Sequence, residues 1–278
     1  MSQSQDPIVT EAIEDYLYSV AGYCPPIHFL IQDYIYDWIT EYYPSGVIHW
    51  RFRTKFGVRD GDYQEWYENG QLHVQCQYAD GKLEGMYLMW DPIGTLLLRK
   101  HYLEDKLHGT REIWYHNGKP LAKTTYQRDK REGPSQEWYR NGQLRITCVY
   151  RDHERDGLYE QWHQNGQKAY EVVYRDGKEY GTFTSWRDYG IIHYQMEYVH
   201  GVRHGAYKQY FEFGELQLEK TYKNGKEEGL CTLYHPNGKI HRLTTYRDGL
   251  REDEETEWDM EGVLLKKVRY VEDRVVPQ

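Results

Sequence analysis

Apolar and polar side chains alternate along most of the chain. Between Leu72 and Tyr78 every second residue is apolar, and the residues between them are His73 and two glutamines. The same alternation recurs in residues 144–150 and 192–198. A period of two is typical of a strand with one buried face, so these segments are predicted to be β-strands.

Short polar turns separate the predicted strands. Asp-Gly or Asn-Gly pairs follow one set of strands, for example at Asp80-Gly81 and Asn224-Gly225. Other Asn-Gly pairs, for example Asn69-Gly70 and Asn141-Gly142, follow the second set. Both kinds of pair accept the positive φ angles that tight hairpins require, so consecutive strands are expected to pair antiparallel.

The pattern of strands and turns repeats every 24 residues without a gap. Two columns of glycine, one of tyrosine and one of tryptophan or tyrosine keep this register. These columns run from Gly46 to Gly262, Gly61 to Gly229, Tyr78 to Tyr270 and Trp66 to Trp258. Such a period indicates a repeat architecture, in which each unit buries its apolar face against its neighbours.

Residues 46–278 are therefore predicted to contain about nine and a half hairpin repeats. The expected fold class is mainly β, an elongated single-layer antiparallel β-meander of repeated hairpins with a small α-helical N-terminal head. We expect the Trp and Tyr columns to form aromatic ladders in the core of this sheet, because large rings bury the most apolar surface.

The first 45 residues lack the repeat and are predicted to form the helical head. One helix is expected from Pro7 to Tyr18 and a second after Pro25-Pro26, because proline is tolerated in the first turn of a helix. Apolar residues recur at helical spacing as far as Ile39. This stripe either caps the first hairpin or docks a partner protein, and the candidate docking residues are Ile27, Leu30, Ile31, Tyr34, Ile35 and Trp38.

The repeat, written YxDGKxxGxxxxWYxNGxL, resembles the variant form of the MORN repeat (membrane occupation and recognition nexus). Residues 78–85, 138–144 and 174–181 carry the match. The repeat is similar to the form found in bacterial antitoxin-like proteins and in large DNA viruses of amoebae. The resemblance implies an interaction or assembly scaffold and implies no reaction. Four residues replace turn glycines of the pattern: Asp105, Asp129, His153 and Asp253.

Charge and cysteine content narrow the functional classes. The formal net charge of −9 disfavours binding to duplex DNA or to anionic lipid. No apolar run reaches the roughly 18–20 residues that cross a bilayer, and no secretory signal is visible at the start. The four cysteines are Cys24, Cys76, Cys148 and Cys231, and none forms a CxxC pair. Cys76 and Cys148 share a column three repeats apart, ~29 Å in a regular array, which is too far for a disulfide. Free thiols favour a reducing, intracellular compartment.

Recognisable catalytic motifs are absent from the sequence, which has no P-loop, GxSxG, HExxH or GxGxxG. We therefore predict no catalytic, cofactor-binding or metal-binding residue, and we expect that the chain is not an enzyme. Acidic residues such as Glu84, Glu132 and Glu228 lie in or near turns that also carry basic residues. They are interpreted as a solvated rim.

The predicted function is a non-enzymatic repeat scaffold that mediates protein–protein interaction or assembly. A structural or host-interaction role in a large DNA virus, including a place in the virion, is a further expectation from the resemblance. Two alternatives stay open: a ubiquitin-ligase adaptor, because residues 24–35 faintly resemble the start of an F-box, and a peripheral membrane protein. The expected partners are proteins of unknown identity or a second copy of the chain, and not nucleic acid.

Overall fold

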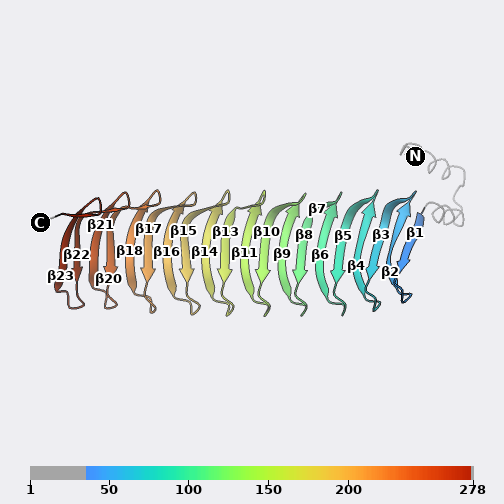
Figure 1. Ribbon diagram of the computed structural model, residues 1–278, viewed down its shortest axis with the longest axis horizontal. Coiled ribbons are helices and arrows are strands. Elements are labelled where there is room, and N and C mark those ends of the chain that lie inside the picture. Colours follow the sequence, from blue (N-terminus) through green and yellow to red (C-terminus); the bar gives the residue numbers. More distant parts are fainter. Residues whose placement is uncertain (1–35, 277–278) are drawn as a thin grey trace. The chain divides into compact units, whose positions relative to one another are not determined.

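The computed structural model describes residues 36–276, which form 24 β-strands and no helix (Figure 1). These described residues divide into two compact units, residues 36–94 with 102–105 and residues 95–101 with 106–276. The strands of the first unit are β1 (Tyr36–Tyr42), β2 (Ile48–Lys55), β3 (Val58–Trp66), β4 (Leu72–Ala79) and β5 (Lys82–Trp90).

The second unit contains most of β6 and all later strands. They are β6 (Leu96–Leu103), β7 (Lys106–Leu107), β8 (Gly109–Trp114), β9 (Pro120–Gln127), β10 (Lys130–Trp138), β11 (Leu144–Arg151), β12 (Glu154–Arg155), β13 (Gly157–Trp162), β14 (Lys168–Arg175), β15 (Lys178–Trp186), β16 (Ile192–Val199), β17 (Val202–Tyr210), β18 (Leu216–Lys223), β19 (Lys226–Glu227), β20 (Gly229–Tyr234), β21 (Ile240–Arg247), β22 (Leu250–Trp258), β23 (Leu264–Val271) and β24 (Arg274–Val276).

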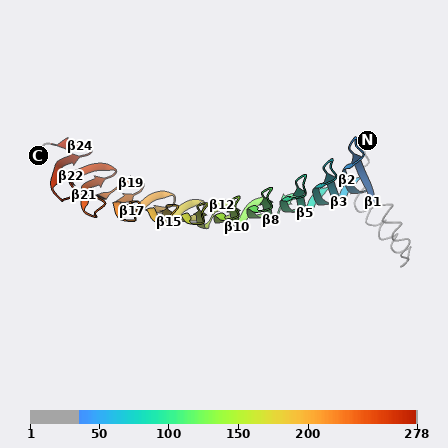
Figure 2. The ribbon, with the colours of Figure 1, turned by 90° about the horizontal axis from the view of Figure 1, so that it is seen from below.

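Paired strands run antiparallel throughout both units. In the first unit, β1 to β5 pair in chain order. In the second unit, the strands from β8 to β24 pair in chain order once the two-residue strands β12 and β19 are left aside. Figure 2 looks along the strands and shows those of the second unit in one layer. The predicted meander of β-hairpins is confirmed.

The predicted helical head is wrong where the structure describes it. Residues Tyr36–Tyr42 form β1, which pairs with β2, although the helix was expected to continue past Trp38. This segment already follows the repeat, because Tyr42 lies 24 residues before Trp66 in the Trp column. Pairing with the neighbouring strand therefore outweighs the helical spacing of its apolar residues. The other docking candidates lie outside the described residues: Ile27, Leu30, Ile31, Tyr34 and Ile35.

The hairpin turns adopt the positive φ angles that their sequences predict. Asp176 and Gly177 have φ angles of 48° and 73°. Where glycine is missing, Asp129 still has a φ of 70°, and its side chain accepts a hydrogen bond from the Leu107 amide at 2.7 Å. A residue with a β-carbon is strained in this conformation. The hydrogen bond to the preceding repeat offsets that strain.

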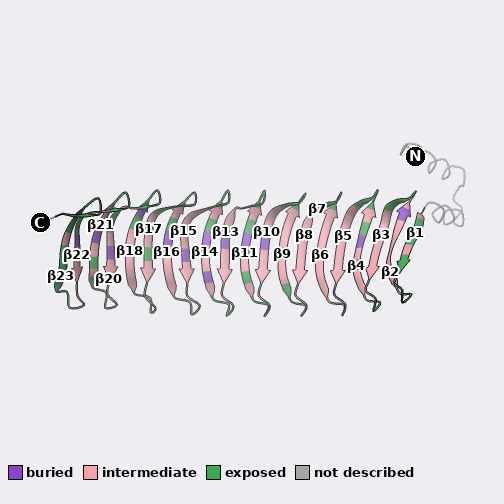
Figure 3. Cartoon of the chain, viewed as in Figure 1, coloured by how far each residue is buried: buried purple, intermediate pink, exposed green. Residues whose placement is uncertain are grey.

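An aromatic ladder runs along one face of the second unit. Ring centroids lie 5.5 Å apart for Tyr159 and Tyr170, 5.3 Å for Tyr170 and Phe183, and 5.5 Å for Phe183 and Tyr194. Tyr159 is 4% exposed, and the adjacent Val172 is 1% exposed. Most other strand residues are only half-buried (Figure 3). The rings of this ladder belong to neither repeat column, so the expected ladders of column residues are wrong. Within the tyrosine column only Tyr222 and Tyr270 are buried, and the other members, like the tryptophan column, are half-buried.

Hydrogen bonds join each repeat to the next at the ends of the strands. The Tyr139 hydroxyl donates to the main-chain carbonyl of Trp162 at 2.7 Å, and Tyr115 donates to that of Trp138 at 2.9 Å. The His163 ring makes the equivalent contact with the Trp186 carbonyl at 3.1 Å. The residues that follow Trp114, Trp138 and Trp162 therefore hold the main chain of the tryptophan in the next repeat.

The Asn-Gly turns supply a second row of bonds between repeats. The side-chain NH2 group of Asn141 donates to the main-chain carbonyl of Gln164 at 3.1 Å. The side-chain oxygen of Asn141 accepts a hydrogen bond from the main-chain N–H of Gln143 at 3.0 Å. Asn165 makes the equivalent bond to the Asp188 carbonyl. Asparagine at this position therefore shapes its own turn and also anchors the next repeat.

Replacing Tyr139 with Phe tests the contribution of these hydrogen bonds. Loss of the hydroxyl leaves the Trp162 carbonyl without its donor, so the free energy of unfolding should fall by about 1 kcal/mol. Urea denaturation followed by circular dichroism measures the change. Tyr180→Phe is the matched control, because its hydroxyl bonds to no described residue. Equal stability of the two variants would contradict this role.

Candidate interaction surface

Alternation along the strands gives the second unit two different faces. In β13, Tyr159 and Gln161 point to one side, and Leu158, Glu160 and Trp162 point to the other. We name these sides the Tyr face and the Trp face. The aromatic ladder described above lies on the Tyr face.

The Trp face carries a row of four tryptophans. This tryptophan row consists of Trp114, Trp138, Trp162 and Trp186, which end β8, β10, β13 and β15. Between them, the register places the side chains of Pro120, Leu144 and Lys168. All four tryptophans are half-buried, and none of their indole nitrogens is both buried and unpaired. Those nitrogens make no hydrogen bond to a described residue, so each N–H group reaches solvent.

Polar side chains line the Trp face beside the tryptophan row. Glu112 binds the Arg99 guanidinium at 2.6 Å and the Lys123 ammonium at 3.2 Å. Lys168 binds Glu160 and Glu171, each at 2.7 Å, while its ammonium lies 5.6 Å from the Trp186 ring. These pairs neutralise one another, so the middle of the Trp face is polar with little local charge.

Exposed apolar side chains lie beyond this polar row. We name Pro134, Val149, Leu158 and Val173 the apolar patch; they come from β10, β11, β13 and β14. Val149 is 41% exposed, Leu158 46% and Val173 37%. Val149 pairs across the strands with Pro134, and Val173 pairs with Leu158. Four adjacent strands thus present contiguous apolar surface to solvent, which is typical of a binding site.

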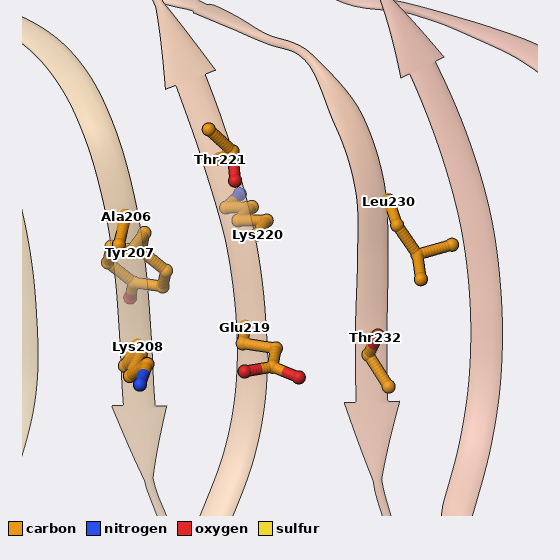
Figure 4. A pocket seen from close by; sticks show the side chains of 8 residues that line it. All are labelled: Ala206, Tyr207, Lys208, Glu219, Lys220, Thr221, Leu230 and Thr232. Atoms are coloured by element: carbon orange, nitrogen blue, oxygen red, sulfur yellow. The ribbon is translucent and has the colours of Figure 1, made fainter.

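A shallow hollow of about 180 Å³ opens between β17, β18 and β20 (Figure 4). Lys208, Glu219, Thr232 and Leu230 are among the side chains that line it. The Glu219 carboxylate accepts a hydrogen bond from the Tyr234 hydroxyl at 2.5 Å. The hollow is large enough for a single side chain of a partner.

A second hollow of about 350 Å³ lies along the Tyr face between Tyr194 and Tyr222. Its polar lining includes Lys220, whose ammonium is 2.5 Å from the Glu227 carboxylate. Burial lowers the pKa of Lys220, but the hydrogen bond and charge of Glu227 outweigh burial and raise it. Lys220 is therefore held as a cation and is poorly suited to serve as a base.

The titratable groups form no recognisable catalytic or metal centre among residues 36–276. No group of three potential metal ligands comes together there. Cys76 and Cys148 are free thiols that are buried. Burial raises the pKa of Cys76 to about 12 and also raises that of Cys148, so neither is an activated nucleophile.

Trp38 is the one predicted docking residue that the structure describes. It lies on β1, is 49% exposed, and its ring lies 4.9 Å from the Arg51 guanidinium carbon. The apolar patch was missed by the sequence interpretation. Its signal was present, because residues 148–150 and 172–174 are each three apolar residues in a row, which breaks the alternation.

Comparison with known families supports a MORN-repeat protein. The family model described as the MORN repeat variant matches six segments, namely residues 59–80, 107–128, 131–152, 155–176, 203–224 and 227–248. Each segment contains a tryptophan or tyrosine of the repeat register and its following Asn-Gly or equivalent turn. MORN repeats are generally protein-interaction or membrane-binding repeats and are of a non-enzymatic type.

Comparisons with curated proteins and with solved structures give no further support for a family. No curated protein matches the chain. Among solved structures, one chain of the crystal structure of TcdB2-TccC3-Cdc42 is similar, with 10% sequence identity and a TM-score of 0.16. The match covers 85% of this chain and only 17% of that one, and so low a score carries no argument. The narrower likeness to antitoxin-like and viral proteins stays a prediction.

Glu112→Gln tests the polar row through its dependence on pH. Burial by itself raises the pKa of Glu112, but hydrogen bonds and charge from Lys123 and Arg99 lower it below its ordinary 4.5. A lowered pKa stabilises the fold above pH 4.5, and this contribution disappears as the pH falls through the folded-state value. The variant should be about 1 kcal/mol less stable at pH 7.

Thermal unfolding between pH 3 and pH 7 measures this difference, which should shrink toward the acid end. Glu137→Gln is the matched control, because its carboxylate is 41% exposed and lies 3.8 Å from Arg145. A difference that is constant with pH, or equal in the control, would show that the Glu112 pairs do not stabilise the sheet.

Proposed function

We propose that the chain is a non-enzymatic repeat scaffold that binds a partner protein on the Trp face of its second unit. The apolar patch is the observation that carries this proposal. Val149 and Leu158 occupy outward positions where a solvated sheet face usually carries polar residues. A patch of this kind, bordered by the polar row, has the anatomy of a protein interface with an apolar centre and a polar rim.

The hydrogen bonds between repeats support the same function. They hold the main chain of Trp138 and Trp162 from the preceding repeat. A main chain that is fixed before binding loses little conformational entropy in a complex. The Trp face is therefore preorganised for recognition, as a scaffold requires.

Membrane binding is the second candidate function, because MORN repeats include membrane-binding members. The net charge of −9 opposes attraction to anionic lipid. The lysines of the polar row beside the apolar patch are paired with glutamates. Within residues 36–276 there is also no helix suited to crossing a membrane. Protein binding is therefore the favoured function.

Three finer expectations stay predictions. The free thiols of Cys76, Cys148 and Cys231 support a reducing compartment. A role in a large DNA virus rests on the resemblance of the repeats alone. The ubiquitin-ligase adaptor stays an alternative prediction, because residues 24–35, which faintly resemble the start of an F-box, lie outside the described residues.

Selection of binding fragments tests the proposed function. A displayed library of protein fragments is selected against the full chain, and the enriched fragments are measured by titration. The double variant Val149→Asp, Leu158→Asp should weaken binding at least about tenfold, because charge is placed in the apolar centre. The control Val199→Asp, Val202→Asp alters an exposed pair at another turn and should bind normally.

Vesicles containing phosphatidylserine provide the second arm of this test. Pelleting of the full chain with these vesicles is expected to be absent. Pelleting that the apolar-patch variant abolishes would favour a membrane protein, and fragments that bind both variants equally would place the interaction elsewhere.

A further inference from the structure

The tryptophan row presents hydrogen-bond donors at a regular spacing. Successive members are separated by two strands, so at ~4.8 Å per strand they lie ~9.6 Å apart. An indole N–H group only donates, and each of the four reaches solvent without a partner among the described residues. A ligand for this row needs acceptors that recur at the same distance.

The spacing distinguishes between the regular peptide conformations. A polyproline II helix advances ~3.1 Å per residue and ~9.3 Å per three-residue turn, about 0.3 Å short of the repeat. Over the three intervals from Trp114 to Trp186 the mismatch reaches only ~1 Å. An extended strand presents one face every ~6.8 Å, and two turns of α-helix advance ~10.8 Å, so both lose register within the row.

We propose that the tryptophan row binds a proline-rich segment of a partner protein in the polyproline II conformation. The segment lies across the strands, and one of its turns contacts each repeat. This inference rests on the proposed function, because it names the chemistry of the partner that the Trp face binds.

Donors and acceptors are complementary in this arrangement. A polyproline II segment has no internal hydrogen bonds, so all its carbonyls are free. Proline has no main-chain N–H, so the segment offers acceptors without competing donors. The row supplies the missing donors, and every third carbonyl of the segment meets one indole N–H.

The spaces between the rings suit proline side chains. Pro120 and Leu144 lie between successive tryptophans and provide apolar surface on which pyrrolidine rings pack. Lys168 is the exception, and Glu160 and Glu171 hold its ammonium near the Trp186 ring. Proline-rich segments dock on aromatic-lined surfaces because their conformation is already ordered before binding.

Fluorescence titration of the full chain with proline oligomers of six, nine and twelve residues tests the inference. Affinity should rise with each added turn up to the twelve-residue peptide, which reaches across the four tryptophans. Replacing Trp138 or Trp162 with Phe removes the N–H group and keeps most of the packing. Each replacement should weaken the twelve-residue peptide roughly threefold to tenfold.

Trp50→Phe is the matched control, because Trp50 stacks on Phe52 at 5.3 Å in the first unit and is outside the row. Trp50→Phe should leave the affinity for the peptide unchanged. Circular dichroism of each variant checks that it is folded. A twelve-residue Gly-Ser peptide that binds equally well would overturn the inference. Affinity that is independent of proline length, or unaffected by Trp138→Phe and Trp162→Phe, would overturn it as well.

These outcomes are separable from failure of the proposed function. If library fragments still bind through the apolar patch while proline oligomers do not bind, the scaffold function stands and the polyproline ligand is wrong. If neither class of ligand binds the Trp face, both proposals are wrong.

Discussion

Packing of each repeat against the next is the interaction on which the rest of the structure depends. Within each unit, the strands pair with their sequence neighbours in one layer. Among residues 36–276 no opposing sheet or helix buries the side chains of this layer, so burial there comes from neighbours along the sheet. Tyrosine and phenylalanine suit this need because their rings reach across the gap between strands, as Tyr170 and Phe183 do.

The same constraint explains why two faces stay available for binding. Only a few side chains, such as Cys148, Tyr159 and Val172, form a compact buried cluster. The hydrogen bonds of Tyr139 and Asn141 to the following repeat keep the sheet ordered where apolar burial is incomplete. A sheet that is held from its sides can carry Val149, Leu158 and four indole N–H groups on an open face. A recognition scaffold needs a sheet that is ordered while one of its faces stays open to a partner.

Most of the fold was predictable from the sequence because the period of 24 residues fixes strands and turns together. The pair Asp176-Gly177 indicates a hairpin turn by its residue types alone, and both residues have positive φ angles. The recurrence of such turns every 24 residues defines the register of the strands. The prediction of a helix from Tyr36 onward was wrong, because the helical spacing of Ile35, Trp38 and Ile39 was given more weight than the repeat position of Tyr42. Pairing of β1 with β2 decided the outcome.

The candidate site was less predictable than the fold. Val173 follows the buried Val172, and only the register shows that it faces solvent beside Leu158. The bond from Tyr139 to Trp162 joins residues in different repeats, so its partner is known only once the strands are placed. Solvent access of the indole nitrogens likewise depends on side-chain orientation, which the period of a strand does not define.

Hydrogen exchange of a Tyr159→Ala variant tests most directly whether neighbouring repeats hold one another. Removing this ring should accelerate amide exchange most in residues 144–186, on either side of the lost stacking contacts, and progressively less toward β20 and β23. Uniform acceleration throughout the second unit, or no acceleration near Tyr159, would contradict the account.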